Sequence, residues 1–150
     1  MNSPLQTPEA YELYIYSLKE HHASIEHSTL TFVRRGASLA KVSGELVFIK
    51  NYKLVVLERL SYDRLPMKID GYGYEVWHGE QKLYWYDSQP HPDEPELQST
   101  HPHHKHIQPN IKHNRVIAPN MSFTKPNLKT LVQEIENLIE STETQSGVKP

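Results

Sequence analysis

The first apolar pattern along the chain has the period of a helix. Four apolar residues follow Thr7-Pro8 at intervals of three and four positions, which places them on one helix face. They are Tyr11, Tyr14, Ile15 and Leu18. Thr7 offers a capping hydroxyl, and Pro8 suits the first helical position, where a backbone N–H would have no partner. The pattern predicts a helix over residues 8–21, preceded by a tail at residues 1–7.

Between residues 25 and 88 the period changes to two, which is typical of strands with one buried face. Turn-forming residues divide this stretch into five runs, namely residues 29–33, 41–48, 52–60, 67–77 and 82–87. In the last run Trp85 and Asp87 share one face, whereas Tyr84 and Tyr86 share the other. Because the turns are short, we expect consecutive strands to pair as an antiparallel meander.

The stretch from Ser88 to Pro126 loses this period and is rich in proline. The prolines lie at positions 90, 92, 95, 102, 109, 119 and 126. Proline fixes φ and donates no backbone hydrogen bond, so a regular helix is excluded and any strand is short or lies at an edge. We expect a long loop over residues 88–126, in which only Arg115-Val116-Ile117 has the composition of a short strand.

The last pattern again has the period of a helix and lies close to the C-terminus. Its apolar residues are Leu128, Leu131, Val132, Ile135, Leu138 and Ile139. Residues 141–150 are polar, and we expect them to form a frayed tail. The predicted fold class is α+β, with one domain at residues 8–140. One twisted antiparallel sheet of about five to six strands carries an N-terminal and a C-terminal helix on one face.

Composition limits what kind of protein this is. A length of 150 residues suits a single domain with one core. Sixteen lysines and arginines against eighteen acidic residues argue against a basic coat for nucleic acid. No apolar run is long enough for a membrane span. Because the chain has no cysteine and Met1 to Thr7 lacks the pattern of a secretory signal, we expect a cytoplasmic protein.

Histidine is the unusual component, because six of the ten histidines lie between His91 and His113. The segment His101-Pro102-His103-His104-Lys105-His106 is the densest part. If it is extended, His101 and His103 share one face, whereas His104 and His106 share the other. Two imidazoles suit the cleavage of RNA without a metal, since one takes a proton from the ribose 2′-hydroxyl and the other gives one to the leaving oxygen. Lys105 would stabilise charge on the phosphate.

Two other interpretations of the same residues stay open. The imidazoles are also zinc ligands, and Asp87 and His91 would complete a tetrahedral shell. The spacing matches neither a zinc finger nor the helical His-Glu-x-x-His motif. The third interpretation is a histidine-rich loop without chemistry.

Three residues outside the dense segment complete the candidate site. Glu58 lies on an otherwise apolar strand face, where a carboxylate is either buried with a partner such as Arg59 or Arg64, or part of a site. Tyr86 belongs to an aromatic group that would stack bases, although most of that group is expected in the core. Arg115 would bind RNA if it gathers on one side of the protein with the other basic residues, which are Arg34, Arg35, Lys41, Lys53, Lys105 and Lys112.

Two segments resemble the TumE family, the toxin component of bacterial toxin–antitoxin pairs. They are Trp85-Tyr86-Asp87-Ser88-Gln89-Pro90-His91-Pro92 and the 101–106 segment. The order of elements agrees with the family over about residues 8–140. The resemblance also places Glu58 and Tyr72-Gly73-Tyr74 where the family has similar strand residues. Ser88 and Pro92 depart from the family pattern, which weakens a role for His91.

The resemblance implies a toxin that is neutralised by a small antitoxin protein encoded beside it. Together with the histidine chemistry, it leads to the first hypothesis, a metal-independent ribonuclease. Its catalytic set is His101, His103, His104, Lys105, His106, Asp87 and Glu58, with His91, Tyr86 and Arg115 binding RNA. The second hypothesis is a non-catalytic module whose histidines hold zinc or contact a partner protein.

Overall fold

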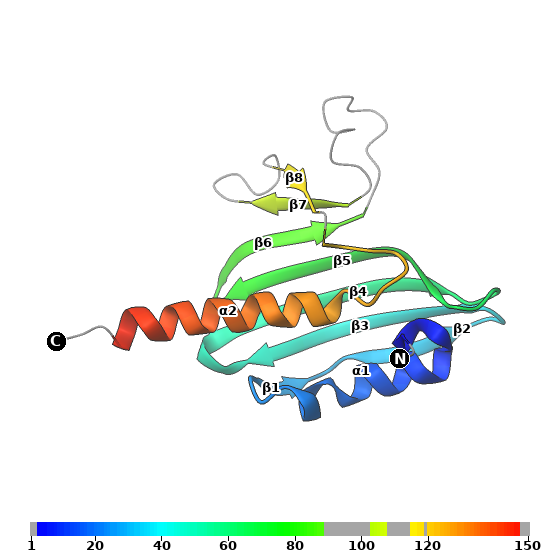
Figure 1. The fold of residues 1–150 in the computed structure, drawn as a ribbon, viewed down its shortest axis with the longest axis horizontal. Coiled ribbons are helices and arrows are strands. Elements are labelled where there is room, and N and C mark those ends of the chain that lie inside the picture. Colours follow the sequence, from blue (N-terminus) through cyan, green and yellow to red (C-terminus); the bar gives the residue numbers. More distant parts are fainter. Residues whose placement is uncertain (1–2, 89–102, 108–114, 119, 148–150) are drawn as a thin grey trace.

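The structure is a computed structural model that describes residues 3–88, 103–107, 115–118 and 120–147. Its elements confirm the α+β class, because one antiparallel sheet lies against two helices (Figure 1). The sheet has eight described strands in the order β1-β3-β4-β5-β6-β7-β8, with β2 also pairing with β3. The strands are β1 (Ile25–Ser28), β2 (Thr31–Arg35), β3 (Leu39–Phe48), β4 (Tyr52–Ser61), β5 (Lys68–His78), β6 (Gln81–Asp87), β7 (His104–Ile107) and β8 (Arg115–Ile117).

The first helix, α1 (Pro8–His21), has the bounds that the sequence predicts. Thr7 caps it, since its Oγ1 accepts a hydrogen bond from the backbone N–H of Ala10 at 3.1 Å. The preceding residues, predicted as a tail, include a short 3-10 helix, η1 (Pro4–Gln6). Leu5 is fully buried, and its carbonyl accepts a hydrogen bond from Met67. One buried leucine therefore holds this segment against the core. A single apolar residue has no periodicity, so the sequence pattern could not predict this contact.

The second helix, α2 (Leu128–Gly147), continues past the predicted start of a polar tail at residue 141. No proline interrupts residues 141–147, and the first glycine is the helix's last residue. Thr142 joins this part to the sheet, because its hydroxyl lies 2.9 Å from the hydroxyl of Tyr52. The helix is therefore longer than its apolar face predicts.

The predicted five-strand meander and the predicted short strand at Arg115–Ile117, which is β8, are confirmed, and two further strands bring the described total to eight. The added strands are β1, before the first predicted run, and β7, within the segment expected as a loop. A second short 3-10 helix, η2 (Ile49–Asn51), makes the turn from β3 to β4. The hydrophobic pattern did not predict β7, because the residues that alternate along this strand are histidines and a lysine. His104 and His106 are buried, while Lys105 between them is half-buried.

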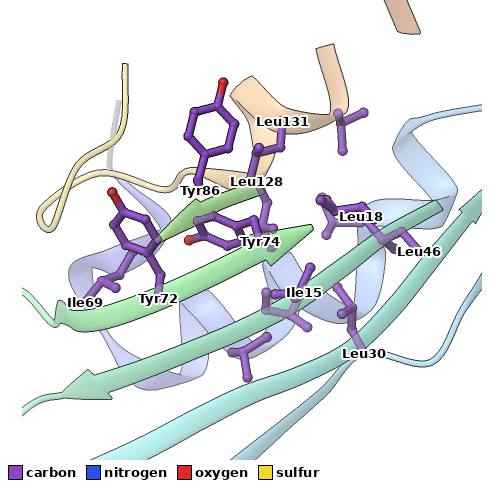
Figure 2. Packing of buried hydrophobic residues seen from close by; sticks show 14 of the residues in the cluster. Ile15, Leu18, Leu30, Leu46, Ile69, Tyr72, Tyr74, Tyr86, Leu128 and Leu131 are labelled. Atoms are coloured by element: carbon purple, nitrogen blue, oxygen red, sulfur yellow. The ribbon is translucent and has the colours of Figure 1, made fainter. Parts of the chain in front are cut away.

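One face of the sheet, called the helix face, packs against both helices. A single buried cluster joins residues of α1 and α2 to residues of β3, β4 and β5. Figure 2 shows Ile15 and Leu18 of α1 and Leu128 of α2 together with Tyr74 and Leu46 of the sheet. The core therefore lies between the sheet and the helices, and it fixes the positions of the central strands.

Alternation along the strands places a different set of residues on the opposite face, called the site face. In the register of β4, β5, β6 and β7 two rows of directly opposed residues cross this face. The first row is Leu57, Gly73, Asp87 and His104, and the second row is Val55, Glu75, Trp85 and His106. Figure 1 shows β7 and β8 at the edge of the sheet beyond β6.

Candidate functional site

Asp87, His104 and His106 come together at the β6–β7 pairing. Asp87 lies directly opposite His104 in the register, and His106 follows two residues later on the same face. The Nε2 atom of His104 contacts Oδ1 of Asp87, and Nε2 of His106 lies 3.1 Å from Oδ2. The two imidazoles therefore converge on the two oxygens of one carboxylate.

The neighbouring imidazoles stabilise the negative charge of Asp87. His104 and His106 are each 1% exposed, whereas the Asp87 side chain is 22% exposed. Burial works against the charged form of Asp87, but hydrogen bonds and charge from the two imidazoles lower its pKa well below the ordinary 3.8. Asp87 is consequently an ionised carboxylate at neutral pH, and solvent reaches the group at this residue.

Trp85 connects the members of the group. Its indole Nε1 donates to Oδ2 of Asp87 at 3.3 Å, and its ring centroid lies 4.4 Å from that of His106. The Nζ atom of Lys82 lies 4.0 Å from the Trp85 ring centroid on the same face. Trp85 belongs, with Tyr86, to the aromatic residues that the sequence predicts to lie mostly in the core. The signal for its role was the face that it shares with Asp87.

The same three residues form a set of metal-ligand type. One oxygen of Asp87 and one ring nitrogen each of His104 and His106 lie within 4.8 Å of one another. Two imidazoles and a carboxylate are a donor set for zinc or another divalent transition metal, with coordination positions left for water or substrate. The donor chemistry thus fits a metal as well as proton transfer.

His103 lies on the helix face, apart from this group. Its Nδ1 lies 2.6 Å from the hydroxyl of Tyr72, and its ring centroid lies 4.3 Å from that of Phe123. Burial, and then the charge of Asp87, raise the pKa of Tyr72, so its hydroxyl stays protonated and can donate to the imidazole. The alternation predicted for an extended histidine segment is therefore present at His103, His104 and His106.

Lys105 and Tyr86 also lie on the helix face. The Lys105 Nζ is 4.0 Å from the ring centroid of Tyr84 and 5.2 Å from that of Tyr86. The hydroxyls of Tyr84 and Tyr86 donate to the two carboxylate oxygens of Glu134 in α2, at 2.9 and 2.8 Å. The structure thus places these two predicted site residues between the sheet and α2, on the opposite side from Asp87.

Glu58 forms a separate buried group on the helix face. Its carboxylate is completely buried and accepts hydrogen bonds from the hydroxyls of Tyr11 and Tyr74, each at 2.5 Å. The Nδ2 of Asn127 donates to the Tyr74 hydroxyl at 3.1 Å. Burial raises the pKa of Glu58, although the two tyrosines partly offset this effect. Glu58 thus has tyrosine partners, in place of the neighbouring arginines that the sequence suggested.

The other predicted site residues are only partly placed. His91 and His101 lie outside the described residues. The backbone of Arg115 in β8 pairs with that of His106, while its side chain is outside the description. Of the ten predicted residues, the structure thus brings Asp87, His104 and His106 together.

A cavity of about 380 Å³ opens on the site face beside this group. Asp87 and Trp85 line it, together with Lys82. Lys82 thus shares the cavity with Asp87, although Lys82 is not among the residues predicted for the site from the sequence. Its register opposite Trp77 across a β-bulge could not be read from the hydrophobic pattern.

The family model described as Toxin TumE matches residues 14–139 of the chain. The chain belongs to the TumE toxin family. The TumE match begins within α1 and ends within α2, so the whole sheet and Asp87, His104 and His106 lie inside it. The resemblance drawn from the two histidine-containing segments is confirmed.

No curated protein and no solved structure matches the chain. In the part of the chain that the structure describes, no helix has both the length and the hydrophobicity to span a bilayer.

Proposed function

We propose that this chain is the toxin of a toxin–antitoxin pair and acts as a cytoplasmic ribonuclease centred on Asp87, His104 and His106. The observation that carries the proposal is the convergence of two imidazole Nε2 atoms on one carboxylate, beside a cavity. Membership of the TumE toxin family supports the toxin role. The same membership supports an antitoxin as the partner that neutralises the protein.

The proposed chemistry needs one proton acceptor and one proton donor. One imidazole removes the proton of a ribose 2′-hydroxyl, and the 2′-oxygen then bonds to the adjacent phosphorus. The bond from phosphorus to the 5′-oxygen breaks, and the other imidazole donates a proton to that oxygen. The products are a 2′,3′-cyclic phosphate and a free 5′-hydroxyl. Because both imidazoles contact Asp87, this carboxylate orients them and stabilises the ring that carries the proton.

Positive charge near the reacting phosphate is assigned to Lys82 rather than Lys105. Lys82 lines the cavity with Asp87, whereas the Lys105 ammonium lies over Tyr84 on the helix face. An ammonium beside the cavity stabilises the charge that develops on phosphate oxygens during the reaction.

The test is cleavage of RNA by the purified protein in excess EDTA. We expect wild type to cleave, and His104→Ala to reduce the rate by about a hundredfold or more, because general acid–base groups contribute about 10²–10⁴-fold. Substrate with a 2′-deoxy sugar at the cleaved position should be resistant.

His103→Ala is the matched control, since it changes the neighbouring histidine on the other face. It should keep most of the cleavage rate, and circular dichroism of both variants checks that they are folded. If His103→Ala abolishes cleavage while His104→Ala does not, the assignment of the site is wrong.

A second function, metal binding, is supported by the ligand geometry of Asp87, His104 and His106. Elemental analysis of the purified protein, with His104→Ala as control, measures it. If stoichiometric zinc is found and no RNA is cleaved with or without EDTA, the ribonuclease proposal is dropped. If cleavage requires the metal and is lost in EDTA, only the metal-independent mechanism is dropped.

A further inference from the structure

One of the residues that line the cavity beside Asp87 has no side chain. Gly73 lies directly opposite Leu57 on one side and Asp87 on the other. A Cβ added at Gly73 would meet no atom within 4 Å, so the space above this residue is open. Glycine weakens a strand interior, and it commonly marks a place where a ligand approaches the backbone closely.

The backbone does not require glycine at this position. The positive φ angles of glycines in this chain occur at Gly36, Gly44 and Gly79, and Gly73 is not among them. Neither backbone conformation nor a close neighbour therefore accounts for glycine at position 73. A side chain at position 73 would instead project into the cavity that Gly73 lines.

The walls of the cavity suit a flat ring with a polar edge. Val55, Leu57 and Trp85 supply apolar surface, and Leu57 is 36% exposed although it is a large hydrophobic residue. Glu75 and Lys82 supply one charge of each sign on the same walls. Glu75 already accepts a hydrogen bond from the Trp77 indole at 2.9 Å and forms an ion pair with Lys82, whose Nζ lies 3.6 Å from Oε2. A carboxylate has two oxygens that accept several hydrogen bonds, so Glu75 retains acceptor capacity for a further donor.

These features fit a nucleobase better than a sugar or a phosphate. A base has two apolar faces that suit Leu57 and the half-buried peptide at Gly73. On Trp85 it would take the place of the Lys82 ammonium, which lies 4.0 Å from the centroid of that ring. A base with an amino group, such as cytosine, donates from its edge to a carboxylate like that of Glu75. The sugar and phosphate attached to a base above Gly73 would lie next to Asp87, which is the neighbouring residue in the same row.

We infer that the cavity above Gly73 is the subsite for a nucleobase of the RNA, held beside the Asp87, His104 and His106 group. The inference rests on the proposed ribonuclease function, for which it names the part of the substrate that is recognised. It assigns binding to Gly73, Leu57, Glu75 and Trp85, none of which the proton transfers require.

The experiment measures binding of cytidine monophosphate and of ribose 5-phosphate to the full-length protein by isothermal titration calorimetry. The two probes differ in the base, and neither contains a bond that the proposed reaction would cleave. Wild type should bind cytidine monophosphate about tenfold more tightly or better, which corresponds to about 1.4 kcal/mol of stacking. Gly73→Leu should remove this difference, because its side chain fills the cavity, and should leave ribose 5-phosphate binding unchanged.

Two further variants keep the experiment decisive. Gly73→Ala adds a single Cβ into open space, so it should fold normally and reduce the difference between the probes by a smaller factor. Lys68→Leu places the same leucine on an exposed position of the same strand, outside the cavity, and should bind both probes like wild type.

The outcomes separate this inference from the ribonuclease proposal. If wild type binds both probes equally, or if Gly73→Leu binds like wild type while folded, the base subsite is refuted even where RNA is cleaved. If the base-dependent binding is present and lost in Gly73→Leu but no RNA is ever cleaved, the subsite stands and the ribonuclease proposal fails.

Discussion

Glu58 is a buried carboxylate whose partners come from distant parts of the chain. Tyr11 is 47 residues away and Tyr74 is 16 residues away, and both hydroxyls donate to Glu58. Burial and then the charge of Glu58 raise the pKa of both tyrosines, so they remain protonated donors. This group joins α1, β4 and β5 through polar contacts inside the apolar core.

The stability contribution of Glu58 should fall as pH rises. Its pKa in the folded protein is raised above the ordinary 4.5, so the folded state holds the proton more tightly than the unfolded state. The stabilisation is therefore complete below the unfolded pKa and is lost as pH rises through the folded pKa. We expect the melting temperature of wild type, relative to Glu58→Gln, to decrease as pH rises above the ordinary pKa of 4.5.

Thermal unfolding of both proteins across this pH range measures the effect. Glu140→Gln is the control, because it makes the same substitution at an exposed position on α2. A wild-type advantage over Glu58→Gln that grows with pH would contradict the prediction, since it would mean that the fold favours the charged carboxylate.

For individual residues, the sequence predicted which side chains are buried better than it predicted their hydrogen-bond partners. The alternation of β4 placed Glu58 on the face of Leu54 and Val56, and all three are buried. It could not identify the tyrosines, because a hydrogen bond between α1 and β4 depends on how the helix crosses the sheet. Asp87 was selected by its place in a motif, and its contact with His104 required the β6–β7 register.

Among the elements, α2 is tied to the sheet by Glu134 as well as by its apolar face. Both carboxylate oxygens of Glu134 accept hydrogen bonds from Tyr84 and Tyr86 of β6. β6 is also the strand that carries Asp87 on its other face. The position of α2 and the position of Asp87 thus depend on the same strand.

Glu134→Ala should destabilise the protein by about 1–3 kcal/mol, because two partly buried hydroxyls lose their acceptor. Urea unfolding gives the free energy, with Glu140→Ala on the exposed side of the same helix as the control. In the Tyr84→Phe/Tyr86→Phe background the cost of Glu134→Ala should become much smaller. An equal cost in both backgrounds would show that the hydrogen bonds do not cause it.

The strand β7 marks the limit of prediction at the scale of elements. The hydrophobic pattern found the two helices and the strands from β2 to β6, since each has an apolar face that packs in the core. β7 has no such face, because its two buried side chains are the imidazoles of His104 and His106. The alternation of β7 can be predicted only from the positions of its histidines, and not from its apolar residues.

For the whole molecule, the sheet separates stability from the candidate chemistry. The helix face holds the core, and the site face holds Asp87, His104, His106 and the cavity. The predicted placement of both helices on one face is what leaves the other face for a site. A substitution on one face should therefore change one property with little effect on the other.

Leu131→Ala tests this separation, because Leu131 is fully buried between α2 and the sheet. We expect a loss of about 2–5 kcal/mol in the free energy of unfolding. RNA cleavage, measured well below the lowered melting temperature, should stay close to the wild-type rate. A large loss of cleavage in the folded variant would show that the two faces are coupled.

The two-residue spacing of β7 has a consequence for how this chain can diverge. His104 and His106 reach the same carboxylate because one residue separates them, so inserting or deleting a residue there would turn one imidazole to the helix face. Point substitutions at Lys105 leave that spacing intact. Evolution can therefore alter the chemistry of this short strand residue by residue, while its length stays constrained.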